Sequence, residues 1–233
     1  KCETQPKKSI CINKKKILFR SDFFDYSREE REKVSTRLMR KVFLDCGSND
    51  GCSVRKFRHL KDKNKEFECF CFEGNPKLFK YHPVDHLCKF YPNIVYGSDE
   101  VIEFYIQGSG GGSTTSKKKY QGYLDKYKCG VEKVQYQPVI LSEFIKNNFS
   151  KHDHIILKLD VEGAEYSILQ NMIDTQVLSY VNEIYIEWHT GKKTDHENCK
   201  GFIKEFNNIC GAMSIPIDPS WDAQQKIYSP SLK

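Results

Sequence analysis

Several signals that would classify a chain at once are missing from these 233 residues. No apolar run approaches the ~18 residues that span a bilayer, and no signal peptide is recognisable. No C-x-x-C pair occurs, so a structural zinc site is not expected, and there is no internal repeat. Neither a basic helix with periodic arginines nor an aromatic-studded RNA-binding strand occurs, so nucleic acid is not an expected partner. These absences favour a globular domain, but an anchor or targeting signal could have stood upstream, so its absence here is uninformative.

The composition supports one folded α/β domain, because 39% of the residues are hydrophobic. The formal net charge of +6 is concentrated in lysine runs at residues 14–16 and 117–119. Such runs are typical of solvated loops, although a positive face could also attract anionic glycans, phospholipid surfaces or nucleic acid. Since the chain starts at lysine rather than methionine, we expect that an upstream segment has been removed.

Ten cysteines are a high number for this length. Four are predicted to be small buried side chains: Cys46, Cys52, Cys69 and Cys71. The other six could form three disulfides in an oxidising lumen: Cys2, Cys11, Cys88, Cys129, Cys199 and Cys210. A glycosylation sequon at Asn148-Phe149-Ser150 agrees with that compartment. We favour the secretory-pathway lumen (Golgi), with a cytosolic chain carrying free thiols as the alternative.

The segment Val42–Gly51, VFLDCGSNDG, combines a short apolar run with a glycine turn. The run Val42-Phe43-Leu44 predicts a fully buried strand, and the glycines allow backbone amides to approach a ligand closely. Apolar residues at helical spacing follow in SVRKFRHL. Strand, glycine turn and helix in this order are typical of a site for a nucleoside-bearing cofactor at the carboxyl edge of a parallel sheet. The glycine spacing is not the G-x-G-x-x-G of dinucleotide dehydrogenases, which makes that class the least favoured.

A second strand, FECFCF, ends on Glu73. Glu73 lies 22 residues beyond Gly51, close to the separation of about 20 at which an acid meets ribose hydroxyls in such units. A carboxylate can accept hydrogen bonds from two vicinal hydroxyls at once, so we predict this role for Glu73. The other interpretation is a solvated acid at a strand end.

A third motif lies in Ile155–Met172, IILKLDVEGAEYSILQNM, which predicts a buried strand, a glycine turn and a helix. Together with DCGSNDG and FEGNP, it resembles the FkbM-type family of S-adenosylmethionine-dependent methyltransferases. The family pattern K-x-D-x-E-G-x-E is complete here, and the resemblance covers roughly Val42 to His189. One departure is Glu73-Gly74-Asn75-Pro76, where the family often has Glu-Pro directly. The resemblance implies a Rossmann-like class I methyltransferase fold, α/β with a mostly parallel, doubly wound sheet and an antiparallel C-terminal end.

The resemblance also implies which residues contact S-adenosylmethionine. The cofactor-binding residues that it implies are Asp45, Gly47, Ser48, Asn49 and Gly51 for the methionine part, Glu73 for the ribose, and Asn75, Ser98 and Asp99 beside the adenosine. The catalytic residues that we predict are Asp160, His189, Lys158 and Glu162.

The acceptor side needs either a base or a metal, because a hydroxyl titrates far above neutral pH. Asp160 ends its strand at the carboxyl edge of the sheet, and Lys158 points to the same face. His189 ends the strand IYIEWH and is the natural general base. Glu162 and Glu165 either position the acceptor or merely favour the start of a helix. Mg²⁺ or Mn²⁺ would suit an all-oxygen site of Asp160, Glu162 and Glu187, but the pattern does not require a metal.

Two domains are predicted. Residues 1–40 form an N-terminal helical extension or lid, with a helix over residues 27–39, and residues 41–233 form the methyltransferase domain. Within it, Asn93–Tyr96 is the expected third strand, and Val101–Ile106 its hairpin partner. The glycine- and serine-rich stretch Gly108–Tyr120 predicts a mobile loop, either a lid over the acceptor or a surface excursion.

The remaining pattern predicts a helix starting at Leu141, a strand over Glu183–Trp188 and a helix around Phe202–Ile209. Short strands near Ser214–Ile217 and Lys226–Tyr228 would form the antiparallel end. Alternating strands and helices indicate a parallel sheet.

From this we expect an S-adenosylmethionine-dependent O-methyltransferase acting on a sugar hydroxyl of a glycan or glycoconjugate. The methyl-transfer fold follows from three ordered motifs, whereas the sugar follows from the family resemblance. Two alternatives stay open: the same enzyme with a lipid, small-molecule or protein acceptor, and a non-catalytic glycan-binding or adaptor domain on the same fold.

Overall fold

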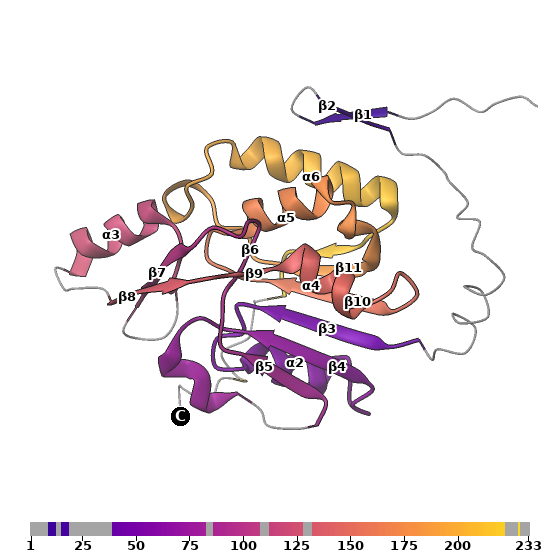
Figure 1. Cartoon of the computed structure of the whole chain (residues 1–233), viewed down its shortest axis with the longest axis horizontal. Helices are drawn as coiled ribbons and strands as arrows, with labels where there is room; N and C mark the ends of the chain where they lie inside the picture. Colours follow the sequence, from indigo (N-terminus) through magenta and orange to yellow (C-terminus); the bar gives the residue numbers. More distant parts are fainter. Residues whose placement is uncertain are drawn as a thin grey trace, which may run out of the picture. The chain divides into compact units, whose positions relative to one another are not determined.

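Figure 1 shows the chain as a computed structural model, which describes residues 9–12, 15–18, 39–82, 86–107, 112–127, 132–221 and 228. The chain divides into two compact units, Lys1–Leu38 and Met39–Lys233. In the first unit, β1 (Ser9–Ile12) and β2 (Lys15–Leu18) pair as an antiparallel hairpin. The helix predicted over residues 27–39 lies, except for Met39, outside the described residues.

The second unit is built on six parallel strands in the order β12-β11-β10-β3-β4-β5. Their bounds are Lys41–Cys46 (β3), Phe67–Phe72 (β4), Cys88–Tyr91 (β5), His154–Leu159 (β10), Val181–Ile186 (β11) and Ile217–Asp218 (β12). Numbered by their own succession along the chain, these strands run 3-2-1-4-5-6, the doubly wound order. The direction of winding reverses between β3 and β10, which are adjacent, so a crevice is expected at their carboxyl ends.

Helices cover both faces of this sheet. On one face, Phe57 of α2 (Cys52–Leu60) stacks on Phe43 of β3 with ring centroids 4.0 Å apart. On the other face, Phe144 of α4 (Leu141–Asn148) meets Phe72 of β4 at 5.1 Å. The helices α5 (Glu165–Asp174) and α6 (Cys199–Met213) contact each other through the rings of Tyr166 and Phe202. The α/β doubly wound fold predicted from the sequence is therefore confirmed.

The described end of the sheet differs from the expected antiparallel end. Strand β12 pairs with β11 in parallel, because α6 crosses over between them as the other helices do between their strands. Of the expected last strand, Lys226–Tyr228, only Tyr228 is described. No helix in the described part of the chain is long and apolar enough to cross a membrane.

The region between β5 and α4 also differs from the prediction. The third strand of the sheet is Cys88–Tyr91, whereas Val95–Tyr96 (β6) pairs with Val139–Ile140 (β9) outside the sheet. The partner of β7 (Ile102–Ile106) is β8 (Glu132–Tyr136), in an antiparallel pair. Three 3₁₀ segments complete the unit: η1 (Pro76–Tyr81), η2 (Val177–Tyr180) and η3 (Gly191–Lys193).

The prediction of a mobile loop over Gly108–Tyr120 is wrong for the described part of this stretch. Thr114 is fully buried and exchanges two backbone hydrogen bonds with Tyr105, at 2.8 and 3.0 Å. Helix α3 (Lys117–Tyr127) begins within the same stretch. Residues 108–111 lie outside the described residues.

The cysteines follow the prediction in part. Cys46, Cys52, Cys69 and Cys71 are buried, as expected. Cys199 and Cys210 are free thiols rather than disulfide partners, and the sulfur of Cys88 lies 3.6 Å from that of Cys71. Residues 2 and 129 are outside the described part of the chain.

Candidate active site

A cavity of about 540 Å³, partly open to solvent, lies at the carboxyl edge of the sheet where β3 and β10 meet. Its wall includes Gly47 and Asn49 after β3, Glu73 after β4, and Asp160 and Glu162 after β10. Five of the residues predicted for cofactor binding or catalysis therefore line one cavity.

The turn after β3 requires glycine at position 47. Gly47 has φ +76°, and a β-carbon there would overlap the carbonyl oxygen of Asp160. The amides of Gly47 and Ser48 both donate to the Phe72 carbonyl, at 3.0 and 2.9 Å. These contacts tie the first strand's turn to β4 and β10, so the cavity floor is held by three strands.

Asp45 and Lys158 lie beneath this turn, and both are essentially inaccessible to solvent (0% and 1% exposed side chains). The Lys158 ammonium donates to the Gly47 carbonyl at 2.7 Å and lies 3.4 Å from both Asp45 and Asp160. Asp45 also accepts a hydrogen bond from the Ser53 hydroxyl. Neither side chain lines the cavity. Both are therefore placed to position the turn and Asp160.

Glu73 forms the cavity wall on the β4 side and is buried. One carboxylate oxygen accepts from the Asn49 amide at 2.9 Å, and the other accepts from the Asn75 amide at 2.6 Å. Burial raises the pKa of Glu73 to about 7, although the two amides lower it. Each carboxylate oxygen has a second lone pair, so this group can still accept hydrogen bonds from a ligand hydroxyl.

Next to Glu73 the cavity is apolar, a feature that the sequence analysis missed. Ile94, Val95 and Phe104 line it together with Phe72. Three of these positions belong to the segment between β5 and β8, whose packing the local pattern did not indicate. An apolar wall beside a carboxylate with free acceptor capacity could hold a flat ring next to a polar, hydroxyl-bearing group.

The other residues predicted to bind cofactor lie outside the cavity wall. Ser48 is buried and donates to the Phe72 carbonyl at 3.2 Å, and Gly51 directly precedes α2. Asn75 caps η1 by accepting from the Lys77 amide at 3.0 Å. Ser98 and Asp99 are on the outer segment after β6, and Asp99 is exposed. Direct cofactor contact by these residues stays a prediction.

The turn after β10 carries two residues in the left-handed region, Glu162 (φ 55°) and Gly163 (φ 112°). For a glutamate this conformation is strained, and such strain is concentrated at functional sites. The Glu165 carboxylate stabilises the turn by accepting from the amides of Val161 and Gly163 at 3.1–3.3 Å. The motif K-x-D-x-E-G-x-E thus builds one tight, hydrogen-bonded connection at the sheet edge.

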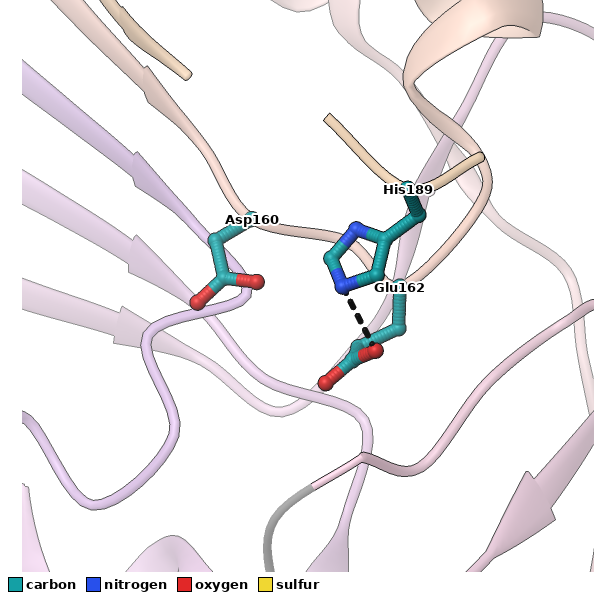
Figure 2. Close-up of side chains that lie close together, drawn as sticks. All are labelled: Asp160, Glu162 and His189. Atoms are coloured by element: carbon teal, nitrogen blue, oxygen red, sulfur yellow. Dashed lines mark ion pairs between the residues drawn. The ribbon is translucent and has the colours of Figure 1, made fainter. Parts of the chain in front are cut away.

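His189 joins this turn from the end of β11, as Figure 2 shows with Asp160 and Glu162. Its Nδ1 lies 2.9 Å from Glu165 and its Nε2 lies 2.8 Å from Glu162. The Glu187 carboxylate is 3.7 Å from the same Nε2. The ring is buried and anchored further by the Tyr166 hydroxyl, which donates to the His189 carbonyl at 2.8 Å.

Lys119 of α3 also enters the site, and no pattern in the sequence singled it out. Its ammonium forms a close ion pair with Glu162, and only 10% of its side chain is exposed. Burial lowers the pKa of Lys119 to about 8, assisted by repulsion from Lys193. The signal was hidden because this lysine belongs to a run of three that resembles a solvated loop.

One group of side chains in the described residues has donor atoms placed for a metal ion. Single donor atoms of Asp160, Glu162 and His189 lie within 4.8 Å of one another. The predicted all-oxygen set contained Glu187 instead of His189. Nitrogen and oxygen donors together are acceptable to Mn²⁺ and related ions as well as Mg²⁺.

The doubly wound sheet has a cavity at its switch point, and Asp160 and Glu162, two of the carboxylates around His189, line it, whereas His189 itself lies behind them. This arrangement is typical of α/β enzymes that bind a ligand at the sheet edge. The family model described as Methyltransferase FkbM domain matches residues 45–210. The chain therefore belongs to the FkbM methyltransferase family, and the predicted resemblance is confirmed. Searches of curated proteins and of solved structures gave no match.

Proposed function

We propose that this methyltransferase uses S-adenosylmethionine to methylate a hydroxyl group, and that the hydroxyl belongs to a sugar of a glycan or glycoconjugate. The observation that carries the proposal is that Glu73, Asp160 and Glu162 line one cavity. Glu73 would bind the ribose of the cofactor, and Asp160 and Glu162 would lie beside the acceptor hydroxyl. Both molecules would then be bound in one cavity, as transfer of a group between them requires.

The residues present fit the cofactor. Glu73 retains acceptor capacity beside two backbone amides, and the apolar side chains Ile94 and Phe104 flank it. The turn through Gly47 and Asn49 would hold the methionine part against β10. When bound, the cofactor supplies a methyl group on a positively charged sulfur, and the methyl–sulfur bond breaks as the acceptor oxygen attacks.

On the acceptor side, His189 is the proposed general base. Nδ1 of the ring faces Glu165, which fixes the ring orientation. Nε2 is therefore directed toward Glu162, which lines the cavity. The hydroxyl proton would pass to Nε2, and the positive charge that then develops on the ring would be stabilised by the neighbouring carboxylates. Asp160 lines the cavity and would orient the hydroxyl.

The sugar acceptor is supported only by the family resemblance and by the polar nature of the cluster. A lipid, small-molecule or protein acceptor is the nearer alternative. Lys117 and Lys118 are exposed at the start of α3, whereas Lys119 is not. Substituting the two exposed lysines should weaken binding of an anionic acceptor and leave a neutral sugar unaffected.

The test is calorimetric titration of S-adenosylhomocysteine into the protein, with Glu73→Ala as the control. Binding in the micromolar range that is lost in the variant supports the cofactor site. Failure of a folded protein to bind would favour the non-catalytic glycan-binding domain. In a glycan turnover assay, Asp160→Asn and His189→Ala should each lower kcat by roughly 10²-fold or more and keep cofactor affinity.

A further inference from the structure

Four carboxylates surround the imidazole of His189: Asp160, Glu162, Glu165 and Glu187. A group of like charges in a partly buried site is costly unless cations compensate them. Of these four, Lys158 lies 3.4 Å from Asp160, and its ammonium also contacts Gly47 and Asp45. Lys119 is the cation in the described residues that contacts Glu162, at the oxygen that also faces His189.

The fold holds Lys119 in this position through its flanking residues. The Asp195 carboxylate accepts from the amides of Lys117 and Lys118, at 2.9 and 3.0 Å, and so fixes the start of α3. The Thr114 hydroxyl donates to the Glu162 carbonyl at 2.5 Å, which joins the same segment to the strained turn. Two anchors in the residues just before Lys119 indicate that the placement of its buried ammonium is specific.

We propose that Lys119 is a positioning residue of the acceptor site and is the built-in cation of the carboxylate–imidazole cluster, occupying the place that a divalent metal would take in the same set of donors. The proposal rests on the proposed function. By holding Glu162, Lys119 limits that carboxylate's hold on Nε2, so that Nε2 can accept the acceptor proton. Without Lys119, the donors of Asp160, Glu162 and His189 would attract a metal ion.

The first test measures Mn²⁺ binding by electron paramagnetic resonance and needs no methyl transfer. Lys119→Met should bind Mn²⁺ at least roughly tenfold more tightly than the unmodified protein, because one positive charge is removed from the donor set. Lys118→Met, an exposed neighbour in the same run, should behave like the unmodified protein. Adding Glu162→Gln to Lys119→Met should abolish the gain. Equal Mn²⁺ affinity in the unmodified protein and in Lys119→Met would overturn the proposal.

The second test separates positioning from folding. Lys119→Met should lower kcat by roughly 10- to 100-fold with unchanged S-adenosylhomocysteine affinity, and Lys119→Arg should restore most of the rate because it keeps the charge. If Lys119→Met fails to fold, Lys119→Arg and Lys119→Gln provide the comparison. Equal rates for those two variants would overturn the proposal. If the unmodified protein binds no S-adenosylhomocysteine, the proposed function fails, while the Mn²⁺ result still decides the role of Lys119 as the cation.

Discussion

Glu73 illustrates how a single buried side chain can control ligand binding at the residue scale. Its carboxyl has a raised pKa of about 7 because burial disfavours the charged form. The group is therefore mostly protonated at pH 6 and mostly ionised at pH 8. Hydroxyl donors of a ribose favour the ionised form, so ligand binding and ionisation support each other.

The expected result is that S-adenosylhomocysteine binds roughly tenfold more weakly at pH 6 than at pH 8, since binding must then pay for deprotonating a group with a pKa near 7. Calorimetry at a series of pH values measures this. Glu73→Gln cannot ionise and should show weak binding that is independent of pH over the same range. A flat profile in the unmodified protein would show that Glu73 does not face the ligand.

Lys158 and Asp45 make a second residue-scale prediction, about stability. Because both are buried and paired, Lys158→Met should lower the free energy of unfolding by roughly 3–5 kcal/mol, as it leaves carboxylates without their cation. The double variant Asp45→Asn/Lys158→Met should lose less than the sum of the single variants. Urea unfolding of the four proteins measures the coupling, and strict additivity would contradict the pairing.

At the element scale, strands with a continuous apolar run could be predicted from the sequence, whereas elements that mix polar and apolar residues could not. The strands β3, β4 and β10 are buried along nearly their whole length, and their apolar runs identified them. Strand β5, CKFY, is an edge strand with half-buried residues, so its pattern carried no clear signal. The helix α3 was missed because its start depends on Asp195, which lies 78 residues from Lys117 in the chain.

Asp195→Ala tests how far α3 depends on that distant cap. Loss of an N-terminal capping carboxylate typically costs about 1 kcal/mol, so α3 should open locally while the sheet stays folded. Amide hydrogen exchange in residues 117–127 should accelerate, and turnover should fall because Lys119 is released, with cofactor affinity unchanged. Asp125→Ala, which removes an exposed carboxylate of the same helix bonded to Gln121, is the matched control. Unchanged exchange in Asp195→Ala would refute this account.

At the scale of the whole molecule, the sheet topology accounts for those residues of the candidate site that lie at the carboxyl ends of the parallel strands. Asp160 directly follows β10, and His189 lies three residues beyond the end of the neighbouring parallel strand β11, so their approach could be predicted from the sequence. Thr114, Lys119 and the apolar wall come from the insertion between β5 and α4, whose path depends on tertiary contacts. The main sheet could therefore be predicted from the sequence. Of the candidate site, only the residues at the strand ends could be predicted, and those of the insertion could not.

The division into two units leads to a final prediction. Every buried core side chain in the described residues lies between Val42 and Trp221, inside the second unit. A chain beginning at Met39 keeps all of these side chains and should therefore unfold in one cooperative transition with a Tm within about 2 °C of the full chain. Its S-adenosylhomocysteine affinity should equal that of the full chain if the first unit takes no part in the cofactor site. The Tm reports a contribution of residues 1–38 to stability, and the affinity reports a contribution to the site. A truncated protein that folds normally but binds weakly would therefore support the lid role predicted for this segment from the sequence.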